Sequence, residues 1–206
     1  MEYVLRTKSL TKKFGSKIAV NAVDMNVAKG DIYGFIGRNG AGKTTAMKLI
    51  LGLLNATEGE IELFGGEPLE KARGRIGSLI EAPGIYKNCT AYENMKRFSI
   101  IYGGTDEDIA QLLKFVGLEN TGNKKAGRFS LGMKQRLGMA IAMLGNPEFL
   151  ILDEPINGLD PEGIKDIRNA VLNLNREKGV TFLISSHLLD ELAKIVTRYG
   201  IINNGV

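Results

Sequence analysis

The chain has 206 residues, 44% of them hydrophobic and 24% charged, a composition ordinary for a globular protein and a length that suits one compact domain. Its net charge of +4, from 27 basic and 23 acidic residues, is too mild for a nucleic-acid-binding surface, so no nucleic-acid partner is expected. The single cysteine excludes an intramolecular disulfide, and the longest apolar stretch, at 137–144, is far short of the ~20 residues that cross a membrane.

The first third of the chain has the pattern of strands with one helix. Residues 18–27 mix β-branched side chains with partial alternation, and 32–37 form a short apolar strand. Apolar side chains then recur at helical spacing over 43–54. Two more strands are predicted at 60–65 and 75–81.

The middle of the chain, 85–146, has the pattern of helices. Thr90 and Thr105 each stand three positions before an acidic residue, which is the capping-box pattern of a helix N-terminus. A third helix is predicted from Ser130 to about Leu144. This block is therefore expected to be a helical insert in a strand-rich core.

Strands and helices alternate again in the last part of the chain. Predicted strands at 149–155 and 180–187 flank a helix at 161–178, which opens with proline and closes at Gly179. The remaining elements are a short helix at 188–196 and a final strand and turn at 199–205. Apolar strands that alternate with helices indicate an α/β fold with a mostly parallel sheet covered on both faces.

A phosphate-binding loop is predicted in the segment GFIGRNGAGKTT, residues 34–45, from its Gly-x-x-x-x-Gly-Lys-Thr spacing. The strand before it and the helix after it argue against a chance glycine-rich turn, because backbone amides and a helix N-terminus together bind phosphates. Lys43 is expected to bridge the outer phosphates, and the Thr44 hydroxyl to bind Mg²⁺. The predicted nucleotide contacts are Gly37, Arg38, Asn39, Gly40, Ala41, Gly42, Lys43, Thr44 and Thr45.

Two adjacent carboxylates follow the apolar strand at 149–152. The carboxyl end of a parallel strand is where such sheets place their ligands, so Asp153 is expected to hold Mg²⁺, directly or through water. Glu154 can polarise a water molecule for attack on the γ-phosphate, which favours hydrolysis over transfer to a second substrate. An acidic helix cap is a weaker interpretation, because the next helix begins only at Pro161.

With these motifs the chain resembles the ATP-binding cassette family, the nucleotide-binding subunits of ABC transporters, over essentially its whole length. The resemblance also includes FSLGMKQR at 129–136, which matches the signature region, NGLD at 157–160, which matches the D-loop, and SSH at 185–187. It implies a P-loop NTPase cassette with a mostly parallel sheet, N-terminal antiparallel strands and an inserted helical subdomain. The implied domain is 1–206, with a core of 1–84 and 147–206 and the helical subdomain at 85–146.

The resemblance assigns further site residues. His187, the only histidine, falls at the switch histidine that contacts the γ-phosphate, although a lone histidine is more often structural. Ser130 and Gly132 would close on the ATP of a partner subunit, and Asp160 belongs to the D-loop. Phe14 matches the aromatic residue that stacks on adenine; the alternative is a packed phenylalanine at a strand end.

Three residues depart from the usual family pattern. Glu81 falls at the Q-loop glutamine, where it can ligate Mg²⁺ and join catalysis but cannot donate an amide hydrogen. Leu131 and Met133 replace a glycine and the glutamine of the signature, and Met133 loses a side-chain donor. The variant pattern is similar to that of bacitracin-type and lantibiotic self-protection exporters.

The resemblance therefore implies an ATPase that uses Mg-ATP to power a separate transmembrane permease, on the inner face of the cell membrane. A second nucleotide-binding subunit, either another copy or a paralogue, would complete each ATP site. The segment 81–102 would grip the permease, with Ile85 and Tyr86 as exposed candidates. One alternative is a non-transport cassette ATPase that acts on a soluble machine; another is a kinase or GTPase, but no NKxD-like guanine selector is found.

Overall fold

The computed structural model describes residues 2–206 and contains two β-sheets. A three-stranded antiparallel sheet has the order β2-β1-β4, with β1 at Tyr3–Phe14, β2 at Lys17–Ala28 and β4 at Glu58–Leu63. A five-stranded parallel sheet has the order β5-β6-β7-β3-β8, with β5 at Ile76–Leu79, β6 at Phe149–Asp153, β7 at Thr181–Ser186, β3 at Ile32–Ile36 and β8 at Arg198–Ile201. The predicted α/β fold is confirmed.

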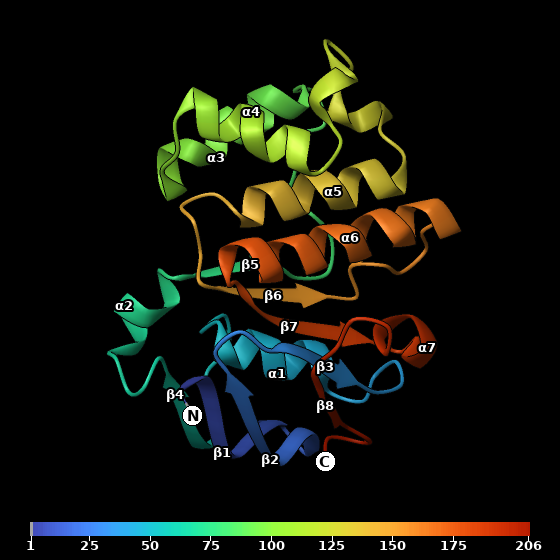
Figure 1. Ribbon diagram of the computed structural model, residues 1–206. Helices are drawn as coiled ribbons and strands as arrows, with labels where there is room; N and C mark the ends of the chain where they lie inside the picture. The colour runs from blue at the N-terminus through green and yellow to red at the C-terminus, as the bar shows by residue number, and fades with distance from the viewer. Residues whose placement is uncertain (1) are drawn as a thin grey trace.

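Helices cover both faces of the parallel sheet, as its apolar strands predict. The helix α1 (Lys43–Ile50) lies between the two sheets, and α6 (Pro161–Lys178) lies on the opposite face (Figure 1). Alternate residues of β6 divide accordingly: Phe149 packs in the core beside α1, whereas Leu150 packs in the core beside α6. A strand buried on both faces has no polar side to alternate, which explains the uninterrupted apolar pattern of β6.

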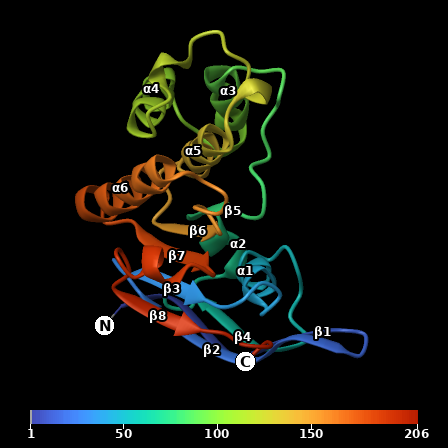
Figure 2. The same ribbon diagram turned by 90° about the vertical axis from the view of Figure 1, so that its right-hand side faces the viewer.

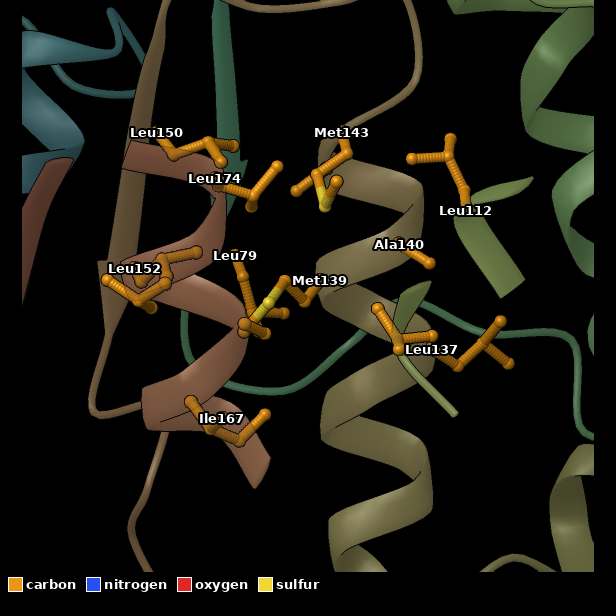
Figure 3. Close-up of a cluster of buried hydrophobic side chains, with 14 of the residues drawn as sticks. Leu79, Leu112, Leu137, Met139, Ala140, Met143, Leu150, Leu152, Ile167 and Leu174 are labelled. Atoms are coloured by element: carbon orange, nitrogen blue, oxygen red, sulfur yellow. The ribbon is translucent and has the colours of Figure 1, made fainter. Parts of the chain in front are cut away.

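Three further helices form a layer beyond α6: α3 (Ala91–Tyr102), α4 (Asp106–Phe115) and α5 (Leu131–Ala142) (Figure 2). In Figure 3, Met139 and Met143 of α5 extend toward α6 and β5, while Leu112 of α4 lies on the far side of α5. The helix α5 therefore packs the helical layer against the sheet-bearing core through one continuous apolar cluster.

Both predicted capping boxes are present. The Thr90 hydroxyl accepts a hydrogen bond from the Glu93 N–H at 3.1 Å, and the Thr90 N–H donates to the Glu93 carboxylate. The hydrogen bond from the Thr90 N–H is the main cause that lowers the pKa of the Glu93 carboxyl, and the hydrogen bond from the Lys125 ammonium is the second. Thr105 and Asp108 cap α4 in the same way. Reciprocal caps satisfy amides that have no partner inside a helix, so these two helices begin where the sequence places them.

Shorter elements differ from the predictions. The helix α1 ends at Ile50 rather than Leu54, because Gly52 takes a positive φ of 75° and the chain turns back onto the Lys48 carbonyl. The predicted helix at 188–196 is only α7 (Leu189–Leu192). The short elements α2 (Leu69–Arg73), η1 (Glu119–Thr121) and η2 (Ala126–Arg128) were not predicted. Within 2–206, no helix combines the length and apolar character needed to span a membrane.

Candidate functional site

The phosphate-binding loop connects β3 to α1 at the carboxyl edge of the parallel sheet. Gly42 precedes α1 with φ 111°, and a Cβ atom there would lie 2.5 Å from the Ala19 carbonyl oxygen, so only glycine fits. No side chain caps this helix N-terminus. Its first amides are therefore available to an anion, and the helix dipole adds partial positive charge.

Lys43 is held inside this loop with only 5% of its surface exposed. Its ammonium group donates to the carbonyl oxygens of Gly37 at 2.6 Å and Arg38 at 3.2 Å. It also lies 3.1 Å from the Glu154 Oε1 atom, as an ion pair without the alignment of a hydrogen bond. The loop thus places a buried positive charge where the sequence predicts the outer phosphates.

The strand β6 delivers Asp153 to the same edge. Its Oδ2 atom accepts a hydrogen bond from the Thr44 hydroxyl at 2.7 Å, and its Oδ1 atom accepts one from the Ser185 hydroxyl at 2.6 Å. A buried carboxylate is stable only when such donors surround it. Two of the three residues predicted to bind Mg²⁺, Thr44 and Asp153, are thus in direct contact.

Glu154 lies just beyond the strand and turns its side chain into the site. Its φ of 49° is in the left-handed region, which is strained for a residue other than glycine. The Oε2 atom lies 2.8 Å from the His187 Nδ1 atom, and Oε1 faces Lys43. The structure therefore brings Lys43, Glu154 and His187 together in one row, from three segments that are far apart in the sequence.

An open pocket of about 590 Å³ lies over the loop. Phe14, at the end of β1, stands at its rim with 48% of its surface exposed, and Lys12 lies 5.1 Å from the centre of its ring. An exposed ring at a pocket rim is consistent with stacking on a base rather than with core packing. The lining residues are Phe14, Lys17, Ile18, Ala19, Asn39, Gly40, Gly42, Lys43, Thr44, Thr45, Glu154, Asn204 and Gly205.

The signature residues lie elsewhere. Ser130 caps α5, and its hydroxyl accepts a hydrogen bond from the Met133 N–H at 3.2 Å. Asp160 caps α6 in the same manner, accepting from the Gly163 N–H at 2.9 Å. Ser130, Gly132 and Asp160 line a second open pocket of about 550 Å³, which shares no lining residue with the phosphate-loop pocket. Within one chain the two parts of the predicted site do not meet.

Glu81 is not joined to the Thr44–Asp153 pair. Its exposed carboxylate forms an ion pair with Lys48 at 2.5 Å, one helical turn beyond Thr44 on α1. Its φ of 62° is in the left-handed region. Ile85 also differs from expectation: it is half-buried and packs against the core, so only Tyr86 of that pair is exposed.

Two residues with direct contacts to the site were missed. Ser185 touches both acidic residues, and Lys48 holds Glu81. The signal for Ser185 was present, because this serine lies near the end of a buried strand and a buried hydroxyl needs partners. Nothing in the helical pattern distinguished Lys48 from any other surface lysine.

Comparison with known proteins gives consistent matches. A family model described as ABC transporter matches residues 20–157. The bacitracin transport ATP-binding protein BcrA of Bacillus licheniformis is 48% identical over 209 residues, covering 100% of this chain and 68% of BcrA. The lantibiotic transport ATP-binding protein SrtF of Streptococcus pyogenes is 44% identical over 202 residues, covering 98% of this chain and 88% of SrtF.

Solved structures share the fold. The crystal structure of a nucleotide-free ATP-binding cassette from an ABC transporter aligns with a TM-score of 0.87 at 32% identity, covering 100% of this chain and 89% of that one. A dimeric ATP-binding cassette in a post-hydrolysis state, bound to ADP and Pi, aligns with a TM-score of 0.85 at 27% identity, covering 98% of this chain and 95% of that one.

Proposed function

We propose that this chain, which belongs to the ABC transporter family, powers a separate permease that exports a peptide antibiotic. As a member of that family it is the subunit that binds ATP and hydrolyses it to drive transport. The family resemblance and the choice of ATP, both predicted from the motifs, are confirmed by these matches. The cargo, the magnesium ion, the permease and the individual residue roles belong to the proposal.

The cargo class is supported by the relatives. One is named for bacitracin transport and the other for lantibiotic transport, and both similarities extend over nearly the whole chain rather than the phosphate loop alone. Export rather than import follows from the resemblance to self-protection exporters, which rests on Glu81 and on the variant signature with Leu131 and Met133.

The observation that carries the hydrolytic role is the position of the Glu154 carboxylate between Lys43 and His187. When ATP binds, the Lys43 ammonium would leave Glu154 for the β- and γ-phosphates. The released carboxylate would then polarise a water molecule for in-line attack on the γ-phosphate. His187 would keep Glu154 oriented from the other side and contact the γ-phosphate.

Thr44 and Asp153 fit a magnesium ion that accompanies ATP. Mg²⁺ prefers oxygen ligands and is usually held by one or two side chains together with substrate phosphates. The Thr44 hydroxyl and the Asp153 carboxylate supply such oxygens, 2.7 Å apart at the mouth of the loop. A bound ion would neutralise charge on the transferring phosphate. Glu81 could join these ligands only after its ion pair with Lys48 opens.

Dimerisation is supported by the separation of the two pockets. Ser130 and the first amides of α5 form a helix N-terminus suited to an anion, but this surface is not part of the phosphate-loop pocket of the same chain. A second subunit, either another copy or a paralogue, would place its own Ser130 and Gly132 on this chain's ATP. The solved relative that is bound to ADP and Pi is dimeric, which supports dimerisation of this chain.

The permease would dock on the helical layer and so hold the chain at the inner face of the membrane. Tyr86 and the end of α3 expose large apolar side chains: Tyr86 is 52% exposed, Ile100 83% and Ile101 73%. The Tyr86 ring also packs on Phe98 of α3, with centroids 5.8 Å apart, so the loop and the helix form one surface. Exposed apolar patches of this kind mark interaction sites.

The test is reconstitution of the chain with the membrane subunit that copurifies with it, followed by measurement of ATP-dependent export of bacitracin. We expect Lys43→Ala to abolish export, and Tyr86→Ala to weaken permease binding. Tyr199→Ala, which removes another exposed tyrosine, from β8, is the matched control. Recovery of no integral membrane protein would refute the proposal and favour a soluble machine, and unchanged export in Tyr86→Ala would exclude the docking surface.

A further inference from the structure

We propose that Ser185 is a positioning residue for ATP hydrolysis, through which one hydroxyl group fixes both acidic residues of the site. The inference rests on the proposed roles of Asp153 and Glu154 and adds to them the group that holds them together. Its basis is a pair of hydrogen bonds that no motif assigns: Ser185 Oγ to Asp153 Oδ1 at 2.6 Å, and Glu154 N to Ser185 Oγ at 2.9 Å.

The parallel sheet places Ser185 beside these residues. In the register of β6 and β7, Asp153 stands directly opposite Ser185. Ser185 is fully buried, with 0% of its surface exposed, so its hydroxyl contacts protein atoms rather than bulk water. A buried hydroxyl without partners costs free energy, so these contacts are a requirement of the folded state.

The direction of both hydrogen bonds is fixed by chemistry. An ionised carboxylate only accepts, so the single Ser185 proton must point to Asp153. A lone pair of the same oxygen then faces the Glu154 N–H, which can only donate. Because a hydroxyl has one proton, this arrangement leaves no second orientation that satisfies both neighbours.

For Asp153 the consequence is a fixed carboxylate. Ser185 holds Oδ1 and Thr44 holds Oδ2, so rotation about the terminal torsion would break both hydrogen bonds. That torsion is otherwise soft, because terminal bonds to planar groups have broad energy wells. Ser185 therefore restricts rotation of the Asp153 carboxylate, which is the group proposed to hold Mg²⁺.

For Glu154 the consequence is a fixed backbone. Its φ of 49° is strained, and such conformations persist only where surrounding contacts enforce them. The hydrogen bond from its N–H to Ser185 holds the peptide group at the entry to this residue. The direction of the side chain toward Lys43 and His187 therefore depends on Ser185, although Ser185 itself does not touch the phosphate-loop lysine.

Another buried hydroxyl of β7 provides a matched control. Thr181 is also fully buried, and its hydroxyl accepts a hydrogen bond from the Gly30 N–H at 2.9 Å. It lies at the opposite end of the strand from Ser185. Thr181→Val thus removes a hydroxyl of equal burial and one backbone hydrogen bond, without contact to either acidic residue.

The first measurement is ATP turnover by Ser185→Ala, Glu154→Gln and the double variant. We expect Ser185→Ala to lower kcat at least tenfold, while the Kd for ATP without Mg²⁺ changes less than about threefold. When Ser185→Ala is added to Glu154→Gln, the fold-decrease in kcat should be at least fivefold smaller than in the wild-type background, because the carboxylate that Ser185 orients is already absent. Equal losses in both backgrounds, or a kcat within twofold of wild type, would overturn the inference.

The second measurement does not depend on turnover. The measured quantity is the factor by which Mg²⁺ lowers the Kd for a fluorescent ATP analogue. We expect this factor to be at least fivefold smaller in Ser185→Ala than in wild type, and the same in Thr181→Val as in wild type. An equal effect of Mg²⁺ in Ser185→Ala and wild type would remove the Asp153 part of the inference. Absence of turnover in the wild-type chain would instead count against the proposed hydrolytic roles, and this binding comparison would still decide the role of Ser185.

Discussion

The Glu154 carboxylate pairs with the Lys43 ammonium, which is the positive charge proposed to bind the phosphates. Lys43 is 5% exposed and the Glu154 side chain 18% exposed, with 3.1 Å between the ammonium nitrogen and Oε1. A phosphate group that enters the loop must compete with this carboxylate and is also repelled by it. Glu154→Gln keeps the shape of the side chain and removes the charge, so we expect it to tighten nucleotide binding.

The size of the effect follows from the geometry. At an effective dielectric constant of about 20, two unit charges 3.1 Å apart interact by about 5 kcal/mol, which is an upper limit. Lys43 also donates to the carbonyl oxygens of Gly37 and Arg38, and the ion pair is partly open to water, so the loss is smaller than this limit. If nucleotide binding breaks about a third of this interaction in wild type, Glu154→Gln avoids that loss and its binding free energy improves by about 1.5 kcal/mol, or roughly tenfold in Kd.

The assay is calorimetric titration with ADP, which has the β-phosphate that Lys43 is proposed to bind but lacks the γ-phosphate that is proposed to be hydrolysed, and so separates affinity from turnover. Glu177→Gln, on the exposed side of α6, changes the net charge equally and serves as the control. We expect roughly tenfold tighter ADP binding in Glu154→Gln and no change in Glu177→Gln. Unchanged or weaker binding in Glu154→Gln would show that the ion pair does not oppose the nucleotide.

Substitutions at three other positions test the fold and the loop. Lys43→Ala should abolish tight ATP binding in titration, and normal affinity would contradict the loop assignment. Gly77→Ala should destabilise the fold by at least about 3 kcal/mol in urea unfolding, because its Cβ atom would lie 1.9 Å from the Ala142 carbonyl oxygen; near-wild-type stability would contradict this packing. Thr90→Ala should cost about 1 kcal/mol through loss of the α3 cap, whereas Thr90→Ser should not.

The sequence predicted the elements whose signals are local. The strand β6 is an uninterrupted apolar run, and α6 carries proline at its start and glycine after its end, so both were placed correctly. The helix α2 has only five residues, too few for periodicity to detect, although Gly74 follows its last residue. Short elements depend on tertiary contacts, here the hydrogen bond from Arg73 to the Ile50 carbonyl.

In the candidate site, too, the residues in local motifs were predicted, whereas the contacts between distant segments were not. Lys43, Thr44, Asp153 and Glu154 were predicted because each sits in a motif whose spacing fixes its position on the sheet edge. The ion pair between Lys43 and Glu154 joins residues more than a hundred positions apart, and it depends on the strand order, which no local pattern encodes. The Glu81–Lys48 ion pair was missed for the same reason.

The mass of Glu154→Gln in solution tests most directly whether two subunits associate when ATP binds. Light scattering should give the 22.4 kDa monomer without nucleotide and twice that mass with saturating Mg-ATP. Adding Ser130→Ala to this variant should weaken the ATP-dependent dimer, because Ser130 of one chain is proposed to close on the nucleotide of the other. A monomer at saturating Mg-ATP would contradict self-association through the signature surface.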